Sequence, residues 1–173
     1  QLPWPEDFAW PHPRGTYETP VRKKWQEVPL KEKVALLFDI NQSMKCQDNI
    51  VYRESSLWCA EELQGYITNQ DGDVLQKITY VAPDISVTAA NEDDAQTRSM
   101  SGRALVRQGG FELLEEMDFQ NRAPAMAAEA VGLLSAPNCP SDRRHALLMP
   151  DQMILQIHES IGHPLETDRI LGD

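Results

Sequence analysis

Two histidines and a glutamate near the end of the chain have nearly the spacing of a zinc-binding helix. His158, Glu159 and His163 occur together in the segment His-Glu-Ser-Ile-Gly-His. In a His-Glu-x-x-His helix, both imidazoles lie on one face and bind zinc, while the glutamate acts as general base. Here the second histidine comes one residue later, which on an ideal α-helix turns it about 140° away from the first. The pattern therefore predicts a metal site only if the last helical turn widens or unwinds.

The residues around the second histidine can disturb a regular helix. Gly162 has no Cβ to resist a change of backbone geometry, and Pro164 cannot continue a regular helix. Because proline disfavours helical geometry in the residue before it, we expect His163 to be extended and the helix to end there. One interpretation without chemistry stays open: the histidines could simply lie at the favourable C-terminal end of a helix dipole.

The segment HESIGHPLETD, with the apolar helix before it, resembles the TldD/PmbA family of zinc metallopeptidases. That family carries a His-Glu-x-x-x-His signature, usually followed by a glutamate three residues later. His158, Glu159, His163 and Glu166 match this signature position by position, whereas Ser160 stands where the family often has alanine. Looser matches lie upstream, at the Gly72 hairpin and in residues 98–110 and 127–140.

The resemblance implies a cofactor and a role for each residue of the motif. It implies zinc bound by His158 and His163 as neutral imidazoles, with Glu159 as the general base that activates a water. Glu166 and Asp168 become candidates for holding the ligands in place, although both could equally be solvent-facing carboxylates. The implied function is a zinc-dependent metallopeptidase that hydrolyses peptides or unfolded protein segments.

The resemblance also implies that part of the site lies outside this chain. In the family, a cysteine from a C-terminal domain completes the zinc site. The chain starts at Gln1 and stops at Asp173, so we expect a fragment of a larger two-domain protein, truncated at both ends and without the C-terminal domain. The third ligand is expected beyond Asp173, and the fragment alone is expected to bind zinc weakly and to be inactive. Cys46, Cys59 and Cys139 have no spacing that would let them substitute.

Other functions remain compatible with the same residues. Members of the family form dimers, sometimes with a related subunit that has lost the metal motif, so we expect a homodimer or a heterodimer. A non-catalytic regulatory or peptide-binding subunit of a TldD/PmbA-type complex, comparable to a DNA gyrase modulator, is the main alternative. A metal-dependent hydrolase acting on other substrates is another. A zinc assay on the parent protein separates the regulatory alternative from the peptidase.

The composition limits the classes of partner that we expect the protein to bind. The 173 residues are 41% hydrophobic and 25% charged, which is typical of a globular protein. The net charge of −11 disfavours binding to nucleic acid or to an anionic membrane, since phosphate groups attract clustered Lys and Arg. No apolar run approaches the roughly 20 residues that span a bilayer. No secretory signal opens the chain, and its three cysteines fit free thiols, so a cytoplasmic location is expected.

The elements that must position the motif indicate an α+β fold in which helices pack on an antiparallel sheet and the chain ends in the metal-motif helix. Residues 1–28 are rich in proline and aromatic residues and are expected to form an arm, with regular structure excluded from its proline-rich part at residues 1–20. Residues 29–173 are expected to form the N-terminal domain of the metallopeptidase. Its first helix is predicted at 29–47, with Leu30, Val34, Leu37, Phe38 and Met44 as the buried stripe. Strands are predicted at 50–57, 62–68, 74–82, 85–89 and 98–106, with a hairpin turn at 69–72, a break at Pro83 and a possible bulge at Gly102.

The second half of the domain is predicted to be mainly helical. Helices are expected at 111–117 and 121–134, the second with a face of small residues that allows close packing. Residues 144–149 are predicted to be a buried strand that leads into the metal helix at Pro150. His12 and His145 stand apart from the motif and are not expected to bind metal. The metal helix itself is predicted from apolar residues at helical spacing, namely Met153, Ile154, Ile157 and Ile161.

Overall fold

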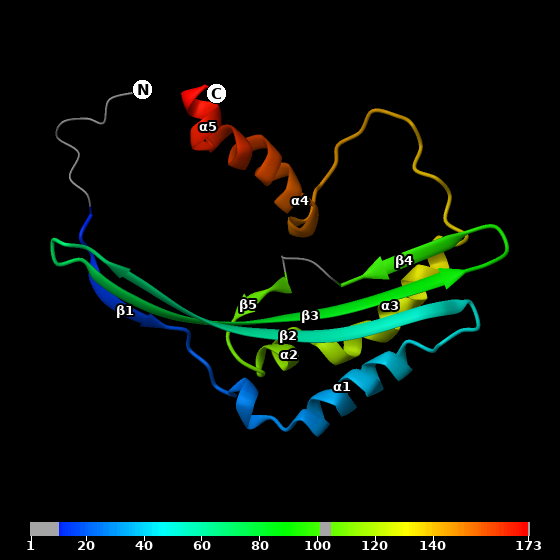
Figure 1. Cartoon of the computed structure of the whole chain (residues 1–173). Helices are drawn as coiled ribbons and strands as arrows, with labels where there is room; N and C mark the ends of the chain where they lie inside the picture. Colours follow the sequence, from blue (N-terminus) through cyan, green and yellow to red (C-terminus); the bar gives the residue numbers. More distant parts are fainter. Residues whose placement is uncertain (1–10, 101–104, 173) are drawn as a thin grey trace.

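The structure is a computed structural model that describes residues 11–100 and 105–172. Within these residues a five-stranded mixed sheet packs against helices, which confirms the predicted α+β class (Figure 1). The predicted bulge at Gly102 and the first ten residues of the predicted arm lie outside the described residues. Among the helices that are described, none combines the length and the apolar character needed to cross a membrane.

A long hairpin forms the centre of the sheet (Figure 1). β2 (Ile50–Ile67) and β3 (Asp73–Ala90) contain 18 residues each and pair antiparallel over almost their whole length. The predicted turn joins them: Asp71 adopts a left-handed conformation with φ 68°, and the backbone N–H of Thr68 donates to the carbonyl of Gly72 at 3.0 Å. The hairpin prediction at residues 69–72 is therefore confirmed.

Three short strands share the other edge of β3. β1 (Arg14–Glu18) pairs with it in parallel, while β5 (Arg107–Gln108) and β4 (Ala95–Ser99) pair with it antiparallel. The predicted antiparallel pairing is present in β2, β4 and β5, and the parallel strand β1, which was not predicted, makes the sheet mixed. The exclusion of regular structure from the arm was wrong: Pro13 and Pro20 flank β1 but leave its five residues free to extend and pair. β4 also ends earlier than the predicted strand at 98–106.

β3 runs without interruption through Pro83, so the predicted break there was wrong. The carbonyls of Thr79 and Ile85 accept hydrogen bonds from Gly109 (3.0 Å) and Met100 (2.8 Å), which places both carbonyls on the edge away from β2. Pro83 has the same parity along the strand, so its nitrogen faces that edge too. Among the described strands, β5 pairs with Tyr80 and Val81, before Pro83, and β4 pairs with residues 86–90, after it. The missing N–H therefore interrupts no ladder. β2 is likewise one strand, not two.

One face of the hairpin is covered by α1 (Leu30–Ser43), α2 (Leu113–Glu116) and α3 (Phe119–Leu133). The small-residue face predicted for the third helix is confirmed, because Ala127 and Ala130 are fully buried. Small side chains let a helix approach its neighbour closely, which strengthens dispersion contacts across the interface. The largest fully buried side chains of this core are Phe119, Ile40, Met44, Ile85, Val81 and Val87.

The buried face of α1 differs from the predicted stripe. Two of the predicted residues do pack in the core, since Met44 is fully buried and Leu37 is partly buried against it. Leu30, Val34 and Phe38 are instead exposed by 75%, 56% and 61%, and Ile40 is fully buried. α1 carries apolar residues around more than half of its circumference, so periodicity alone allowed more than one inward face. Its rotation coincides with polar contacts to β2 that periodicity does not reveal, including the Ser55 hydroxyl, which donates to the Leu37 carbonyl at 2.9 Å.

A C-terminal helical arm follows the core. It consists of α4 (Pro150–Ile157), η3 (His158–Gly162), η4 (His163–Leu165) and α5 (Thr167–Leu171), and none of these elements has a buried residue. The prediction of a buried strand at 144–149 was wrong, because these residues are exposed and form no regular structure, with Leu147 at 90% exposure. The arm begins beside α3 and β4, whose side chains share a cavity with the first residues of α4.

Candidate metal centre

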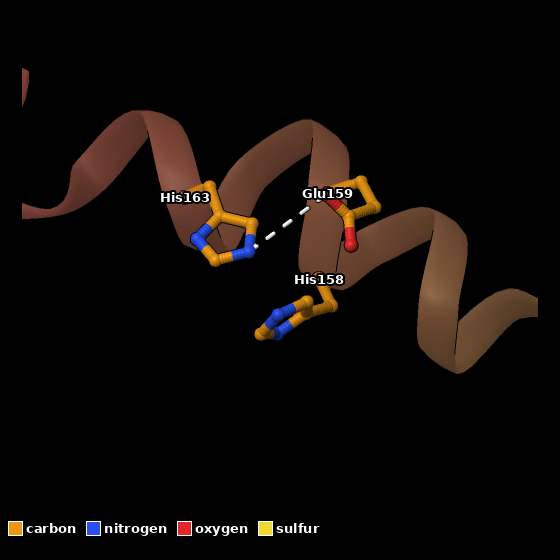
Figure 2. Close-up of side chains that lie close together, drawn as sticks. All are labelled: His158, Glu159 and His163. Atoms are coloured by element: carbon orange, nitrogen blue, oxygen red, sulfur yellow. Dashed lines mark ion pairs between the residues drawn. The ribbon is translucent and has the colours of Figure 1, made fainter.

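The two histidines of the motif meet because the helix between them is a π turn. In η3 the backbone N–H of His163 donates to the carbonyl of His158, five residues earlier. A π turn accommodates one more residue than an α turn, so the residue five positions on takes the place that i+4 has in an α-helix. The ring centroids are 4.3 Å apart, and Figure 2 shows both rings on the same side of the helix. This is the widening that the five-residue spacing required.

The way in which the helix widens differs from the sequence prediction. His163 has φ −59° and ψ −44°, so it remains helical, and the prediction that it is extended was wrong. Gly162 is also helical, and a Cβ there would meet only Nδ1 of His158 at 3.6 Å, an ordinary contact. Pro164 explains the change of hydrogen-bond pattern better, because it has no N–H to offer to the carbonyl four residues back. The helix then continues through Pro164 as η4.

Three side chains of the turn could hold a metal ion together. His158, Glu159 and His163 each offer a ligand atom, and these atoms all lie within 4.8 Å of one another. Two nitrogens on a tetrahedral zinc ion are about 3.3 Å apart, given Zn–N bonds of roughly 2.0–2.1 Å. Side-chain rotation alone can therefore close the group around an ion. Glu159 Oε2 lies 3.7 Å from Nε2 of His163 (Figure 2).

A second carboxylate orients one of the imidazoles. Glu166 Oε1 lies 2.7 Å from Nδ1 of His163, and Glu166 Oε2 lies 3.2 Å from Nε of Arg169. The hydrogen bond with His163 holds the pKa of Glu166 below its usual value, and the nearby charge of Arg169 acts in the same direction. An ionised carboxylate only accepts hydrogen bonds, so Nδ1 must be the donor, and in the neutral imidazole Nε2 is then left with a free lone pair. This is the arrangement in which a histidine binds metal through Nε2.

The other candidate residues are not brought to this group. Asp168 lies in the first turn of α5, and within the described part of the chain its carboxylate has no hydrogen-bond or ion-pair partner. His12 instead contacts the Thr68 hydroxyl at 2.9 Å, beside the hairpin turn. The free cysteines belong to other regions and do not join the histidine–glutamate group. The sequence analysis did not predict a contact for Arg169, although its spacing of three from Glu166 is typical of an ion pair on a helix.

Comparison with known proteins finds a distant relative of this chain. Neither the family models nor the solved structures gave a match. A metalloprotease of Methanothermobacter thermautotrophicus is 29% identical over 150 residues, which cover 85% of this chain and 32% of that protein. The chain thus spans about a third of the length of the curated relative it matches.

Proposed function

We propose that this chain carries the metal-binding helix and the general base of a TldD-like zinc metallopeptidase that hydrolyses peptides or unfolded protein segments. The observation that supports the proposal most strongly is the π turn, which lets the His-Glu-x-x-x-His spacing place both imidazoles on one side of the helix. The likeness to a metalloprotease favours the same class of activity. The TldD-like assignment rests on the match of the motif, including Glu166.

The donor atoms suit zinc. Catalytic zinc sites combine one to three imidazole nitrogens with other His, Glu or Cys ligands and leave one position for water. His158 and His163 would hold the ion, and Glu166 keeps Nε2 of His163 available for it. When bound, zinc lowers the pKa of a coordinated water and polarises a carbonyl group. As the resemblance implies, we propose that the third protein ligand comes from a part of the parent protein outside this chain.

Glu159 is the residue that we assign to proton transfer. It follows His158 directly, and its carboxylate lies 3.7 Å from the nitrogen of His163 that faces the group. A carboxylate in this position can take a proton from a water and later donate it to the leaving amine. Its side chain is 58% exposed, so solvent and substrate can reach it.

The test is the isosteric substitution Glu159→Gln in the full-length parent protein. Peptide hydrolysis should fall by about 10²- to 10⁴-fold, while the zinc content stays the same, because the amide cannot take the proton. Glu92→Gln is the matched control, since Glu92 is an exposed glutamate in the turn between β3 and β4, away from the motif. Normal hydrolysis by Glu159→Gln would remove this residue from the assigned role.

A peptide-binding or regulatory subunit is the second candidate, and one feature of the sheet favours it. β2 is the outermost strand of the described sheet, and no described strand pairs with its edge away from β3, although the Asn41 side chain of α1 donates to the Arg53 carbonyl there at 3.1 Å. Such an edge can accept an extended peptide by main-chain pairing. A binding subunit of this kind would retain peptides in the presence of a metal chelator and show no hydrolysis with zinc restored. Zinc-dependent hydrolysis by the parent would exclude a purely regulatory role.

A further inference from the structure

A basic cavity lies where the C-terminal helical arm leaves the core. It has a volume of about 720 Å³ and is bounded by β4, β5, α3 and the first residues of α4. Its charged residues come from four elements that are far apart in the sequence. We define the basic cavity by its charged lining residues, Arg98, Arg107, Arg122, Glu129 and Asp151.

The cavity has an excess of positive charge. Arg98 is neutralised by Glu129, with Nε and NH2 at 2.9 and 2.8 Å from the same carboxylate oxygen. Arg107 and Arg122 take part in no ion pair among the residues that the structure describes, and Asp151 is the remaining carboxylate of the lining. Three arginines against two acids leave one net positive charge in a chain whose net charge is −11. The cavity is therefore suited to an anionic group.

The cavity and the metal centre are connected by α4. Asp151 and His158 are seven residues apart, which is about two turns, so the two side chains leave nearly the same face of the helix. At 1.5 Å per residue, this separation corresponds to about 10 Å along the axis. An extended peptide covers that distance with about three residues. A substrate lying along α4 would thus reach both places at once.

We propose that the basic cavity binds a carboxylate of the peptide substrate, about three residues from the bond that is cleaved. Arg107 and Arg122 would hold this carboxylate, since guanidinium groups bind carboxylates through paired, charge-assisted hydrogen bonds. Met100, Met126 and Met149 also line the cavity and would surround the apolar stem of an acidic side chain. This inference rests on the proposed peptidase function and names the substrate class, acidic peptides, that the site prefers.

The test measures binding of fluorescent peptides to the chain in the presence of a chelator, so that it does not depend on hydrolysis. Three peptides are compared: one with an internal glutamate and an amidated end, the same peptide with glutamine, and the glutamine peptide with a free C-terminal carboxylate. The first should bind about five- to tenfold more tightly than the second, as expected for one partly screened charge pair. Tighter binding of the third than the second would identify the terminal carboxylate as a further source of the anion.

Substitutions then locate the effect. Arg107→Gln and Arg122→Gln should each remove most of the preference for a carboxylate, and added salt should weaken it in the unaltered chain. Arg143→Gln is the matched control, because Arg143 is exposed in the loop before α4 and does not line the cavity. Circular dichroism checks that each variant is folded.

The outcomes separate the two proposals. Equal binding of all three peptides, or a preference that survives both cavity substitutions, would overturn the carboxylate site whatever the parent protein hydrolyses. A preference that depends on Arg107 and Arg122, in a parent protein without peptidase activity, would keep the carboxylate site and refute the proposed function. Zinc-dependent hydrolysis without any preference for acidic peptides would keep the proposed function and refute the carboxylate site.

Discussion

The contact between Glu166 and His163 allows a direct test of the metal centre. Glu166→Gln keeps the shape of the side chain but removes the charge that fixes the proton on Nδ1 of His163. Asp168→Asn is a matched control two residues away, because the carboxylate of Asp168 contacts no polar partner among the described residues. Both substitutions remove one negative charge near the site. Only the first should change the orientation of the imidazole.

The size of the effect follows from the contact. A separation of 2.7 Å is typical of a short, charge-assisted hydrogen bond. Removing such a partner of a metal-binding histidine commonly lowers metal affinity by about 10- to 100-fold. The side chains of His163 and Glu166 are 28% and 44% exposed, and a glutamine oxygen can still accept the hydrogen bond. We therefore expect about a tenfold loss for Glu166→Gln, and less than about twofold for Asp168→Asn.

Two measurements check this expectation. Competition with a chromophoric chelator gives the zinc affinity of each variant of the parent protein, and nitrogen NMR of this chain reports which nitrogen of His163 carries the proton. The hydrogen bond with His163 lowers the pKa of Glu166, so the contribution of its carboxylate is complete above the pKa of a free glutamate. It is lost as the pH falls through the lower pKa of the folded state.

The reasoning fails if both substitutions weaken zinc binding equally. That result would mean that general charge near the site matters and that the specific contact does not. It also fails if the proton of His163 is found on Nε2 in the unaltered chain, because Nε2 would have to lose that proton before it could bind a metal ion.

Three further changes test the turn and the fold. Gly162→Ala should leave zinc binding unchanged within about twofold, because its Cβ would meet only the His158 ring at an ordinary 3.6 Å, and the alanine should stabilise the helix by up to about 1 kcal/mol. One alanine inserted between Ser160 and Ile161 should abolish zinc binding, since it turns the second imidazole by about 100°. Burial raises the pKa of Glu112, but hydrogen bonds from backbone N–H groups outweigh this and hold it below its usual value. Glu112→Gln should therefore lower the free energy of unfolding by about 1–2 kcal/mol at neutral pH, measured by urea denaturation. The difference should vanish as the pH falls through the lowered pKa.

Each of these changes has a result that would contradict it. Loss of zinc binding in Gly162→Ala would show that the turn needs glycine after all. Unchanged binding after the insertion would mean that the histidines do not act as a pair. A destabilisation by Glu112→Gln that persists in acid would show that its backbone hydrogen bonds do not depend on the charge of the carboxylate.

The grouping of His158, Glu159 and His163 could be predicted from the sequence because it is local. With Glu166, these residues lie within nine positions, and helical geometry relates spacing to direction over so short a distance. The arithmetic that placed the second imidazole about 140° from the first also showed that the turn must widen. The sequence did not decide between the two residues that could cause the widening. Proline removes a hydrogen bond at a defined position, whereas glycine only permits a change.

The sheet shows where local rules stop. Pro83 reads as a strand breaker, and whether it breaks the strand depends on which edge its nitrogen faces and whether another strand pairs there. Both facts depend on β4 and β5, which come later in the chain. The same holds for α1, whose rotation agrees with contacts to β2 as well as with its own apolar pattern. The sequence therefore predicted the hairpin turn and the core helices, whereas the continuity of β3 at Pro83 and the orientation of α1 depend on contacts with distant parts of the chain.

The basic cavity, too, depends on contacts between distant parts of the chain and could not be predicted from local sequence rules. Arg98, Arg107 and Arg122 stand on three different elements, and no spacing rule relates them. Composition even pointed the other way, since a net charge of −11 suggests that anions are repelled. Charge acts over about one Debye length, roughly 10 Å, so a local excess can attract a carboxylate even where the whole molecule is acidic. Only the fold, by pairing β4 and β5 along β3 and laying α3 beside them, creates that excess next to the first turn of α4.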